Sequence, residues 1–542
     1  MNTVATPASP STSAERQKSW LIMAGLWAVL LVLAALRPLA VPDEGRYGEV
    51  SRWMLQSGDW LTPRSNGIPL FHKPPLLYWL QAMSLSVFGI NVWALRLVPA
   101  LHAAVMLVAL YLGARRIAGE AVARRAAIML GTSLTFLLGG QYVNHDMMVA
   151  AWISVAIWCF GLAFMGHDKP DAALARWGFV ACALGMMSKG LIGFVLPGLV
   201  LFLWLLWTRR LKQIVYLPWA SGVGLFALIV VPWFALVQQK YPGFLRYMFW
   251  HQQFERYTAQ TFNNQQPTWF YLLALVLLLF PWVFLALSRM TLPHFRGSVP
   301  TVTAGGQANQ QGLSFCWIWV IAITVFFSIP SSKLLGYILP VVPAVALLAA
   351  VGWEQRIAHR KRAGQIFLAL CVLSMGIAAA AVLNVARLTA TWRSQDIAQV
   401  LACAAGANDT IYAAGNYPFD LPFYAQITQP MVLLDDWPQQ RKTASDGWER
   451  EFFEGVDFEQ EMARFLQPLS TLAAAGQAPG AWLVVRAPSN LLAAGTDWML
   501  HAAGAGWNLY RSSGTLSRAG SGALTLEGPE AGQHKGLPGC KQ

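Results

Sequence analysis

The sequence predicts an all-α polytopic membrane domain followed by a soluble α/β domain. Of the 542 residues, 56% are hydrophobic and only 12% are charged, a balance that no soluble domain of this size has. The apolar residues are gathered in runs long enough to cross a bilayer, with short basic clusters between them. After Arg387 the apolar runs stop and short, turn-separated segments begin.

About eleven apolar runs qualify as spans, because a helix needs about 20 apolar residues to cross a bilayer. They cover residues 20–36, 92–112, 125–140, 147–166, 177–189, 191–207, 214–236, 268–288, 313–330, 334–352 and 364–386. The segment 37–91 holds further apolar stretches that we expect to lie in the interface or dip into it, so we predict about 11 to 13 transmembrane helices. Residues 1–19 are polar and are expected to form a disordered tail, followed by an uncleaved first helix. Residues 20–386 would form the membrane domain.

The basic clusters indicate the orientation. On this count of spans they fall on one side of the membrane, together with the N-terminal tail, and cytoplasmic loops carry an excess of Lys and Arg. The clusters are Arg115, Arg116, Arg124 and Arg125; Arg209, Arg210 and Lys212; and Arg356, Arg360, Lys361 and Arg362. We therefore predict a cytoplasmic N-terminus, with segments 37–91, 237–267 and 387–542 on the opposite face. The net charge of +13 is dispersed among these clusters, which excludes a nucleic-acid-binding surface.

Residues 387–542 are enough for a small α/β domain outside the membrane. Thr410–Ala414, Met431–Leu434 and Trp482–Arg486 have the composition of short strands, and Ser394–Cys403 and Phe458–Phe465 have helical patterns.

The six cysteines show no metal-binding spacing. Four of them, Cys159, Cys182, Cys316 and Cys371, lie in or beside apolar spans, where a reduced, packed thiol is expected. Cys403 and Cys540 lie in the C-terminal region, and the sequence leaves open whether they pair.

Charged residues gather beside a membrane boundary in the segment 42–75. It contains Asp43 and Glu44, and about twenty residues later His72 and Lys73. Charges near hydrocarbon are costly unless they are paired, hydrated or used, which favours a functional site. The alternative is that Asp43 caps a helix. Apolar residues between Glu44 and Leu55 recur at helical spacing, so we expect an amphipathic helix that rests in the interface plane.

Two further outer segments carry polar groups. Asp146 lies at a junction between two spans, where an N-cap is the structural alternative. The aromatic loop 249–257 contains His251 and Arg256, and an interfacial amphipathic helix is the alternative there. Lys189 and Lys333 fall at the outer boundary, where either snorkelling or phosphate binding accounts for them.

Together these segments suggest a site in which Lys73 and Arg256 hold an anionic lipid headgroup while Asp43 does acid–base work. A polyprenyl-phosphate sugar is a fitting substrate. A lipid or ion transporter is the alternative from another class. It predicts charges near the bilayer midplane and inverted repeats, and the sequence shows neither.

At these residues the chain resembles the membrane glycosyltransferases of the GT-C superfamily. It is most similar to the bacterial branch of aminoarabinose transferases and relatives of dolichyl-phosphate-mannose–protein mannosyltransferases. The motifs that carry the resemblance are Asp43-Glu44-Gly45-Arg46-Tyr47-Gly48-Glu49, Ser57-Gly58-Asp59-Trp60-Leu61-Thr62-Pro63-Arg64, His72-Lys73-Pro74-Pro75, Ser188-Lys189-Gly190, Phe280-Pro281-Trp282 and the stretch from Ser332-Lys333 to Pro340. As a set they are specific, and they cover most of residues 40–350.

The resemblance implies an inverting, nucleotide-free transfer of a sugar from a polyprenyl-phosphate donor to an acceptor outside the cytoplasm. Asp43 would be the central catalytic group and Asp146 a second acid, and Glu44 is a further catalytic candidate. Lys73 and Arg256 would bind the lipid phosphate. We add His72, His251, Lys333 and Tyr337 as substrate-binding candidates.

The chain departs from its relatives at two positions. They commonly carry Glu where this chain has His72, and Glu-His where it has Gln252-Gln253. Some aminoarabinose transferases bind a divalent metal near these positions, so His72 and His251 are possible metal ligands here. The best single hypothesis is transfer of 4-amino-4-deoxy-L-arabinose from undecaprenyl phosphate to lipid A or another envelope glycoconjugate, in the bacterial inner membrane with a periplasmic site. Protein O-mannosylation is the rival within enzymes.

Overall fold

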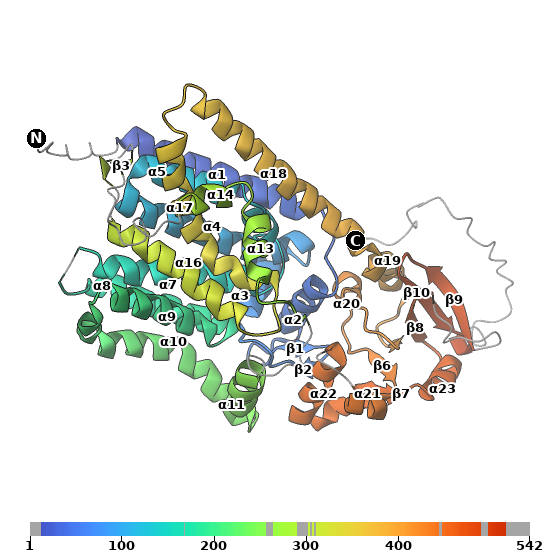
Figure 1. The fold of residues 1–542 in the computed structure, drawn as a ribbon. Coiled ribbons are helices and arrows are strands. Elements are labelled where there is room, and N and C mark those ends of the chain that lie inside the picture. Colours follow the sequence, from blue (N-terminus) through green and yellow to red (C-terminus); the bar gives the residue numbers. More distant parts are fainter. Residues whose placement is uncertain are drawn as a thin grey trace, which may run out of the picture. The chain divides into compact units, whose positions relative to one another are not determined.

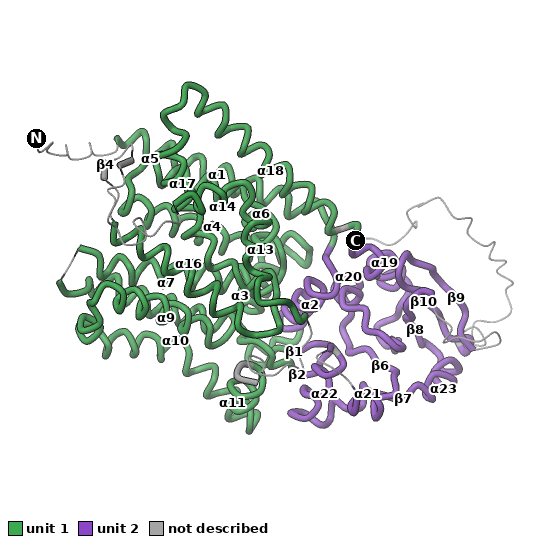
Figure 2. Tube along the Cα trace, in the orientation of Figure 1, with its two compact units in different colours: residues 1–38, 57–63, 70–387 green, residues 39–56, 64–69, 388–542 purple. Residues whose placement is uncertain are grey.

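The computed structural model describes residues 12–166, 168–255, 264–289, 302–303, 306–307, 310–443, 447–488 and 497–515. The chain forms two compact units, coloured separately in Figure 2. Unit 1 comprises residues 1–38, 57–63 and 70–387, and unit 2 comprises residues 39–56, 64–69 and 388–542. The first outer segment is therefore shared between the two units.

Unit 1 is helical. Its helices are α1 (Ser13–Ala35), α3 (Leu76–Phe88), α4 (Val92–Ala118), α5 (Glu120–Gly131), α6 (Leu134–Gly139), α7 (Asp146–Phe164), α8 (Ala172–Lys189), α9 (Ile192–Trp207), α10 (Trp219–Lys240), α11 (Phe244–Arg246), α13 (Phe270–Leu278), α14 (Val283–Leu287), α16 (Gln310–Ser328), α17 (Val342–Arg356) and α18 (Ala363–Leu388). A π-helical segment, η2 (Tyr247–Glu255), follows α11, and a 3₁₀ helix, η3 (Leu335–Val341), precedes α17. A short pairing joins β3 (Val302–Thr303) and β4 (Gly306–Gln307). Figure 1 shows most of the longer helices side by side as a bundle.

Seven helices within the described residues are long and apolar enough to cross a membrane: Ser13–Ala35, Val92–Ala118, Asp146–Phe164, Trp219–Lys240, Gln310–Ser328, Leu335–Arg356 and Ala363–Trp392. The prediction of a helical, multi-span domain is confirmed. The other predicted spans form helices that are shorter, interrupted or, as in α8, less apolar. The run 125–140, for example, is divided between α5 and α6, because the side chain of Ser133 caps a new helix by accepting from the backbone N–H of Phe136 at 3.3 Å.

The first helix also begins earlier than its apolar run. Thr12 is the N-cap of α1, and its hydroxyl accepts from the backbone N–H of Glu15 at 3.3 Å. Residues 13–19, which we expected in a disordered tail, are therefore the first turns of α1. Residues 1–11 lie outside the described part of the chain.

The core of unit 1 packs aromatic rings against glycines. A Cβ on Gly113 would lie 2.5 Å from the ring of Trp158, and a Cβ on Gly161 would lie 2.4 Å from the ring of Phe315. Small residues of this kind let helices approach closely where lipid provides no hydrophobic drive for association. The bundle is therefore held by close packing.

Unit 2 contains a six-stranded mixed sheet in the order β7-β6-β5-β8-β10-β9. The strands are β5 (Thr410–Ala414), β6 (Val432–Asp435), β7 (Leu466–Pro468), β8 (Ala481–Arg486), β9 (Trp498–Ala503) and β10 (Trp507–Ser512). The first four in space are parallel, and β10 runs antiparallel to β8 and β9. The helices are α19 (Gln395–Ala404), α20 (Leu421–Ala425), α21 (Trp437–Thr443), α22 (Trp448–Phe458) and α23 (Thr471–Gln477) (Figure 1). The predicted α/β class is confirmed.

The local predictions for unit 2 were close but not complete. All three expected strands and the helix expected over Ser394–Cys403 are present within one residue at each end. The helix expected over Phe458–Phe465 is instead the end of α22 followed by a 3₁₀ turn, η5 (Gln460–Phe465). The backbone of Glu459 leaves the helical region, with φ −142° and ψ 84°, and so separates the two elements.

The helix of the first outer segment, α2 (Asp43–Ser57), and the hairpin β1 (Arg64–Ser65) and β2 (Ile68–Pro69) both belong to unit 2. The charged residues Glu44, Glu49 and Arg52 of α2 are 0%, 1% and 1% exposed. A helix that rests in the interface plane keeps its polar face in water, so that prediction is wrong. The helical periodicity was correct, but tertiary contacts enclose both faces.

The cysteines follow the expected division. Cys159, Cys182, Cys316 and Cys371 are free thiols, and three of them are buried. Cys403 is disulfide-bonded. Cys540, the partner that we considered, lies outside the described residues.

Candidate functional site

Asp43 is the first residue of α2, and its side chain is 45% exposed. One guanidinium nitrogen of Arg46, a turn later, lies 3.5 Å from the Asp43 carboxylate. The other terminal nitrogen of Arg46 lies 2.5 Å from the carboxylate of Glu451, on α22. Arg46 therefore links the candidate catalytic acid to the C-terminal part of the chain.

Glu44 has a different environment from Asp43. It is fully buried, and its carboxylate accepts a hydrogen bond from the backbone N–H of Ala40 at 2.7 Å. This bond satisfies one of the backbone donors that a helix start leaves open. Glu44 thus fixes the chain at the beginning of α2, and its candidate catalytic role stays a prediction.

A buried ion pair lies further along α2. Arg52 donates two hydrogen bonds to Glu49, at 2.6 and 2.7 Å, and a third to the carbonyl of Ile427 at 2.8 Å. Burial raises the pKa of Glu49 despite the opposing effect of Arg52. The pair and its bond to Ile427 hold α2 against the C-terminal residues of unit 2.

In unit 1, Asp146 is the first residue of α7, but its side chain does not cap that helix. Its carboxylate forms an ion pair with the ammonium of Lys189, at the end of α8, and accepts from the side-chain amide of Asn144 at 3.0 Å. Lys189 also lies over the ring of Tyr337, 4.4 Å from its centroid. The structure thus brings together two predicted site residues, Asp146 and Tyr337, through Lys189, for which the sequence suggested either snorkelling or phosphate binding.

Gly336 closes this cluster from one side. A Cβ on Gly336 would lie 1.9 Å from the carboxylate of Asp146. Only glycine leaves room for the acid at this position. The glycine next to Tyr337 therefore makes the space that the Asp146 carboxylate occupies.

His72, Lys73 and His251 are partly buried residues of unit 1. The rings of His72 and His251 both lie beside Tyr247, with centroids 6.3 and 5.7 Å from the centroid of the tyrosine. The loop that carries His251 is π-helical where it is described. The structure therefore brings His72 and His251 toward one common ring.

Lys333 is 2% exposed, and its ammonium donates to the carbonyls of Gln266, at 2.9 Å, and Pro330. Its backbone N–H donates to the carbonyl of Asn264 at 3.0 Å. Lys333 joins two segments of unit 1, and its predicted role in substrate binding is not tested by these contacts.

The predicted residues are divided between the two units. Asp43 and Glu44 belong to unit 2, whereas Lys73, Asp146, Lys333 and Tyr337 belong to unit 1. Arg256 lies outside the described residues. That Asp43, Lys73 and Arg256 share one cavity stays a prediction.

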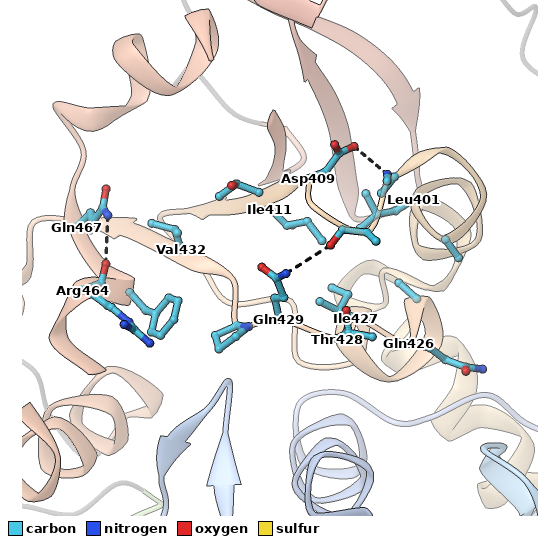
Figure 3. A pocket seen from close by; sticks show the side chains of 18 residues that line it. Leu401, Asp409, Ile411, Gln426, Ile427, Thr428, Gln429, Val432, Arg464 and Gln467 are labelled. Atoms are coloured by element: carbon cyan, nitrogen blue, oxygen red, sulfur yellow. Dashed lines mark hydrogen bonds between the residues drawn. The ribbon is translucent and has the colours of Figure 1, made fainter. Parts of the chain in front are cut away.

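A cavity of unit 2 lies away from these residues. It measures about 470 Å³ and lies at the amino ends of β5, β6 and β7, where Asp409, Val432 and Gln467 line it (Figure 3). None of the predicted site residues lines it. Ligands of open α/β sheets bind at the carboxyl ends of strands, so this cavity is not our candidate site.

The described residues contain no group of three or more His, Cys, Asp or Glu side chains arranged to hold a metal ion. His72 and His251 are two imidazoles near Tyr247, and two ligands are fewer than the three that catalytic zinc sites use. The side chains in the described part of the chain therefore do not fit the divalent metal that the resemblance allowed.

Comparisons with known proteins agree with the motifs. Residues 20–248 match the sequence profile of the dolichyl-phosphate-mannose-protein mannosyltransferase family. Two proteins of Pseudomonas fluorescens, undecaprenyl phosphate-alpha-4-amino-4-deoxy-L-arabinose arabinosyl transferases 2 and 1, are 32% and 33% identical to the chain over 343 and 373 residues. These matches cover 60% and 66% of this chain, and the chain spans about three fifths of each relative, 59% and 62%.

The crystal structure of ArnT from Cupriavidus metallidurans bound to undecaprenyl phosphate has the same fold. It superposes with a TM-score of 0.75 over 96% of this chain and 100% of that chain, at 24% sequence identity. The resemblance of this chain to GT-C membrane glycosyltransferases of the aminoarabinose transferase type is thereby confirmed.

Proposed function

We propose that this chain is an integral membrane glycosyltransferase that transfers a sugar from an undecaprenyl-phosphate-linked donor to an acceptor outside the cytoplasm. The names of its relatives indicate 4-amino-4-deoxy-L-arabinose as the sugar, and the acceptor that we propose is a phosphate of lipid A. The observation that carries the proposal is that the matched region 20–248 contains Asp43, Lys73 and Asp146, three of the residues singled out from the sequence.

The proposed reaction is an inverting displacement. An oxygen of the acceptor attacks the anomeric carbon of the donor, and the bond from that carbon to the polyprenyl phosphate oxygen breaks. The leaving phosphate takes the electron pair and the negative charge, which Lys73 and Arg256 would stabilise by charge-assisted hydrogen bonds. A lipid A phosphate is already ionised, so it needs positioning more than deprotonation. Asp43 would then orient the acceptor and stabilise developing positive charge on the sugar.

The second acid has its charge balanced within unit 1. Because Lys189 pairs with Asp146, Asp146 is not a strong candidate for the base. We assign the pair to positioning, with Tyr337 as the wall against which the Lys189 ammonium rests.

The proposed location is the bacterial inner membrane, with the N-terminus cytoplasmic and unit 2 in the periplasm. The basic clusters support this orientation. The disulfide at Cys403 supports it independently, because disulfides persist in the oxidising periplasm and are rare in the cytosol.

A transfer assay on the purified chain tests the proposal. Labelled undecaprenyl-phosphate aminoarabinose would be offered with either lipid A or a Ser- and Thr-containing peptide as acceptor. We expect label on lipid A. Label on the peptide alone would favour the protein-mannosyltransferase-like alternative. Movement of donor between leaflets of a vesicle, with no transfer, would favour a lipid transporter.

The Asp43→Asn variant gives the residue-level prediction. Removing the charge while keeping the shape should lower the transfer rate by at least about a hundredfold, because electrostatic stabilisation at the reacting centre is lost. Membrane abundance should not change, since Asp43 is 45% exposed. Asp457→Asn, at an exposed acid of α22, is the matched control and should transfer like the unaltered chain. Full activity of Asp43→Asn would refute the catalytic assignment.

A further inference from the structure

Residues 39–56 and 64–69, the part of segment 37–91 that belongs to unit 2, are held at both ends by the C-terminal part of the chain. At its start, the backbone N–H of Leu39 donates to the hydroxyl of Tyr424 at 2.9 Å. At its end, the side chain of Asn66 exchanges two hydrogen bonds of 2.8 Å with the backbone of Met431. Such paired bonds to backbone fix the register of the two segments.

The middle of this segment, α2, approaches the C-terminal part of the chain too closely for a side chain at Gly45. A Cβ on Gly45 would lie 3.0 Å from the backbone of Phe419 and of Asp420. Two turns later Arg52 donates to the carbonyl of Ile427 at 2.8 Å, and Gln56 donates to the carbonyl of Thr428 at 3.2 Å. The helix that begins with Asp43 is thus seated on α20 and the residues around it.

One face of α22 makes the remaining contacts. Glu451, Gly455 and Glu459 recur every four residues, which places them on one side of a helix. Glu451 pairs with Arg46 at 2.5 Å, and Glu459, just after the last turn, pairs with Arg64 at 2.9 Å. Between them, a Cβ on Gly455 would lie 2.3 Å from the carbonyl oxygen of Pro69.

Two other acids of α22 pair with arginines of the C-terminal part of the chain. Glu454 pairs with Arg450 at 2.8 Å, within the same helix. Asp457 pairs with Arg441 of α21, and both side chains are 55% exposed. The residues Glu451, Gly455 and Glu459 thus lie on the face that receives Arg46, Pro69 and Arg64.

We infer that the C-terminal part of the chain is a positioning element for the helix that carries Asp43, and that Glu451 acts through Arg46. Arg46 lies between two carboxylates: one terminal nitrogen pairs with Glu451 at 2.5 Å, and the other lies 3.5 Å from Asp43 and donates to the hydroxyl of Tyr47 at 2.8 Å. Without Glu451, Arg46 is left to move toward Asp43, so that both the place and the charge environment of Asp43 change. This inference rests on the proposed function, in which Asp43 is the catalytic acid, and it assigns a role to a domain that contributes no predicted catalytic residue after residue 387.

The test compares Glu451→Ala with Asp457→Ala in the full-length chain. Glu451→Ala should lower kcat about tenfold or more, because displacement of a catalytic group by about 1 Å costs up to about a hundredfold. The KM for the lipid donor should stay within about twofold, since the phosphate-binding candidates lie elsewhere in the sequence. Glu451→Asp, which keeps the charge on a shorter side chain, should recover part of kcat. Asp457→Ala should match the unaltered chain in both constants.

Hydrogen exchange provides a readout that does not depend on transfer. Amides of residues 44–50 should exchange faster in Glu451→Ala than in Asp457→Ala, and Glu451→Ala should add nothing in an Arg46→Ala background, because the two residues act as a unit. Unchanged kcat and unchanged exchange in Glu451→Ala would overturn the inference. If the unaltered chain transfers no sugar, the proposed function fails, and exchange still decides whether Glu451 positions α2.

Discussion

The contact between Gly336 and Asp146 shows how one missing side chain shapes the candidate site. Asp146 and Lys189 are each about nine-tenths buried, with side chains 11% exposed. A buried ion pair is favourable only where its geometry is good, because both charges lose water. Gly336 supplies the space that this geometry needs.

Gly336→Ala should therefore displace the Asp146 carboxylate from Lys189. We expect the transfer rate to fall at least about tenfold, because a shift of about 1 Å at a positioning residue can cost more than that. The rate is measured in the lipid A assay, alongside the melting temperature of the purified protein.

Gly376→Ala is the matched control, because a Cβ at that position meets nothing within 4 Å. It should leave both quantities unchanged. If Gly336→Ala transfers at the rate of the control, Asp146 does not need its present position.

At the scale of elements, the start of α19 depends on a buried acid. Asp420, just before α20, accepts from the backbone N–H of Ser394 at 3.1 and 3.2 Å and from its hydroxyl at 2.7 Å. Ser394 is the N-cap of α19 and its side chain caps no backbone N–H of that helix, so Asp420 holds the helix start by accepting from the backbone and hydroxyl of the cap residue itself. Burial raises the pKa of Asp420 to about 6.

This raised pKa predicts a pH dependence of stability. The Asp420 carboxyl binds a proton more tightly in the folded chain than in the unfolded one. Its contribution to folding stability is therefore full below about pH 4 and is lost as the pH rises through about 6. A shift of about two units corresponds to about 3 kcal/mol. Melting of the unaltered chain and of Asp420→Asn would be compared at pH 4.5, 5.5 and 6.5.

The advantage of the unaltered chain over Asp420→Asn should shrink as the pH rises, since the variant has no proton to lose. Glu49, whose pKa is also raised, is present in both chains and cancels in the comparison. A difference that is constant over this range would contradict the assignment.

At the scale of the whole molecule, the charge pattern and the disulfide support one orientation. The three basic clusters lie at the end of α4 and in α5, after α9, and around the end of α17, and Cys403 is disulfide-bonded. A topology in which α17 ends in the cytoplasm and α18 leads to unit 2 outside agrees with both.

Reporter fusions test this orientation. Alkaline phosphatase, which folds only outside the cytoplasm, should be active when fused after residue 515 and inactive when fused after residue 362. A cytoplasmic fluorescent reporter at the same positions is the control and should give the opposite result. Phosphatase activity at residue 362 would reverse the proposed topology.

The sequence by itself determined the classes of structure and most of the local elements. Apolar runs of about 20 residues give spanning helices wherever the backbone must bond internally in lipid. Short segments with the composition of strands, separated by turn residues, predicted β5, β6 and β8 to within one residue. The motifs around Asp43, Lys73 and Asp146 identified the family resemblance, because functional groups are constrained in residue type.

Tertiary structure alone decided the partners. The pattern of α2 predicts a helix with one solvated face, but Glu49 and Arg52 are buried as a pair and Arg46 reaches Glu451, which is 405 positions away in the sequence. Lys189 forms an ion pair with Asp146, a partner that the sequence did not indicate. Periodicity reports which residues share a face of one element, whereas the burial of a charge depends on which distant segment brings its counter-charge.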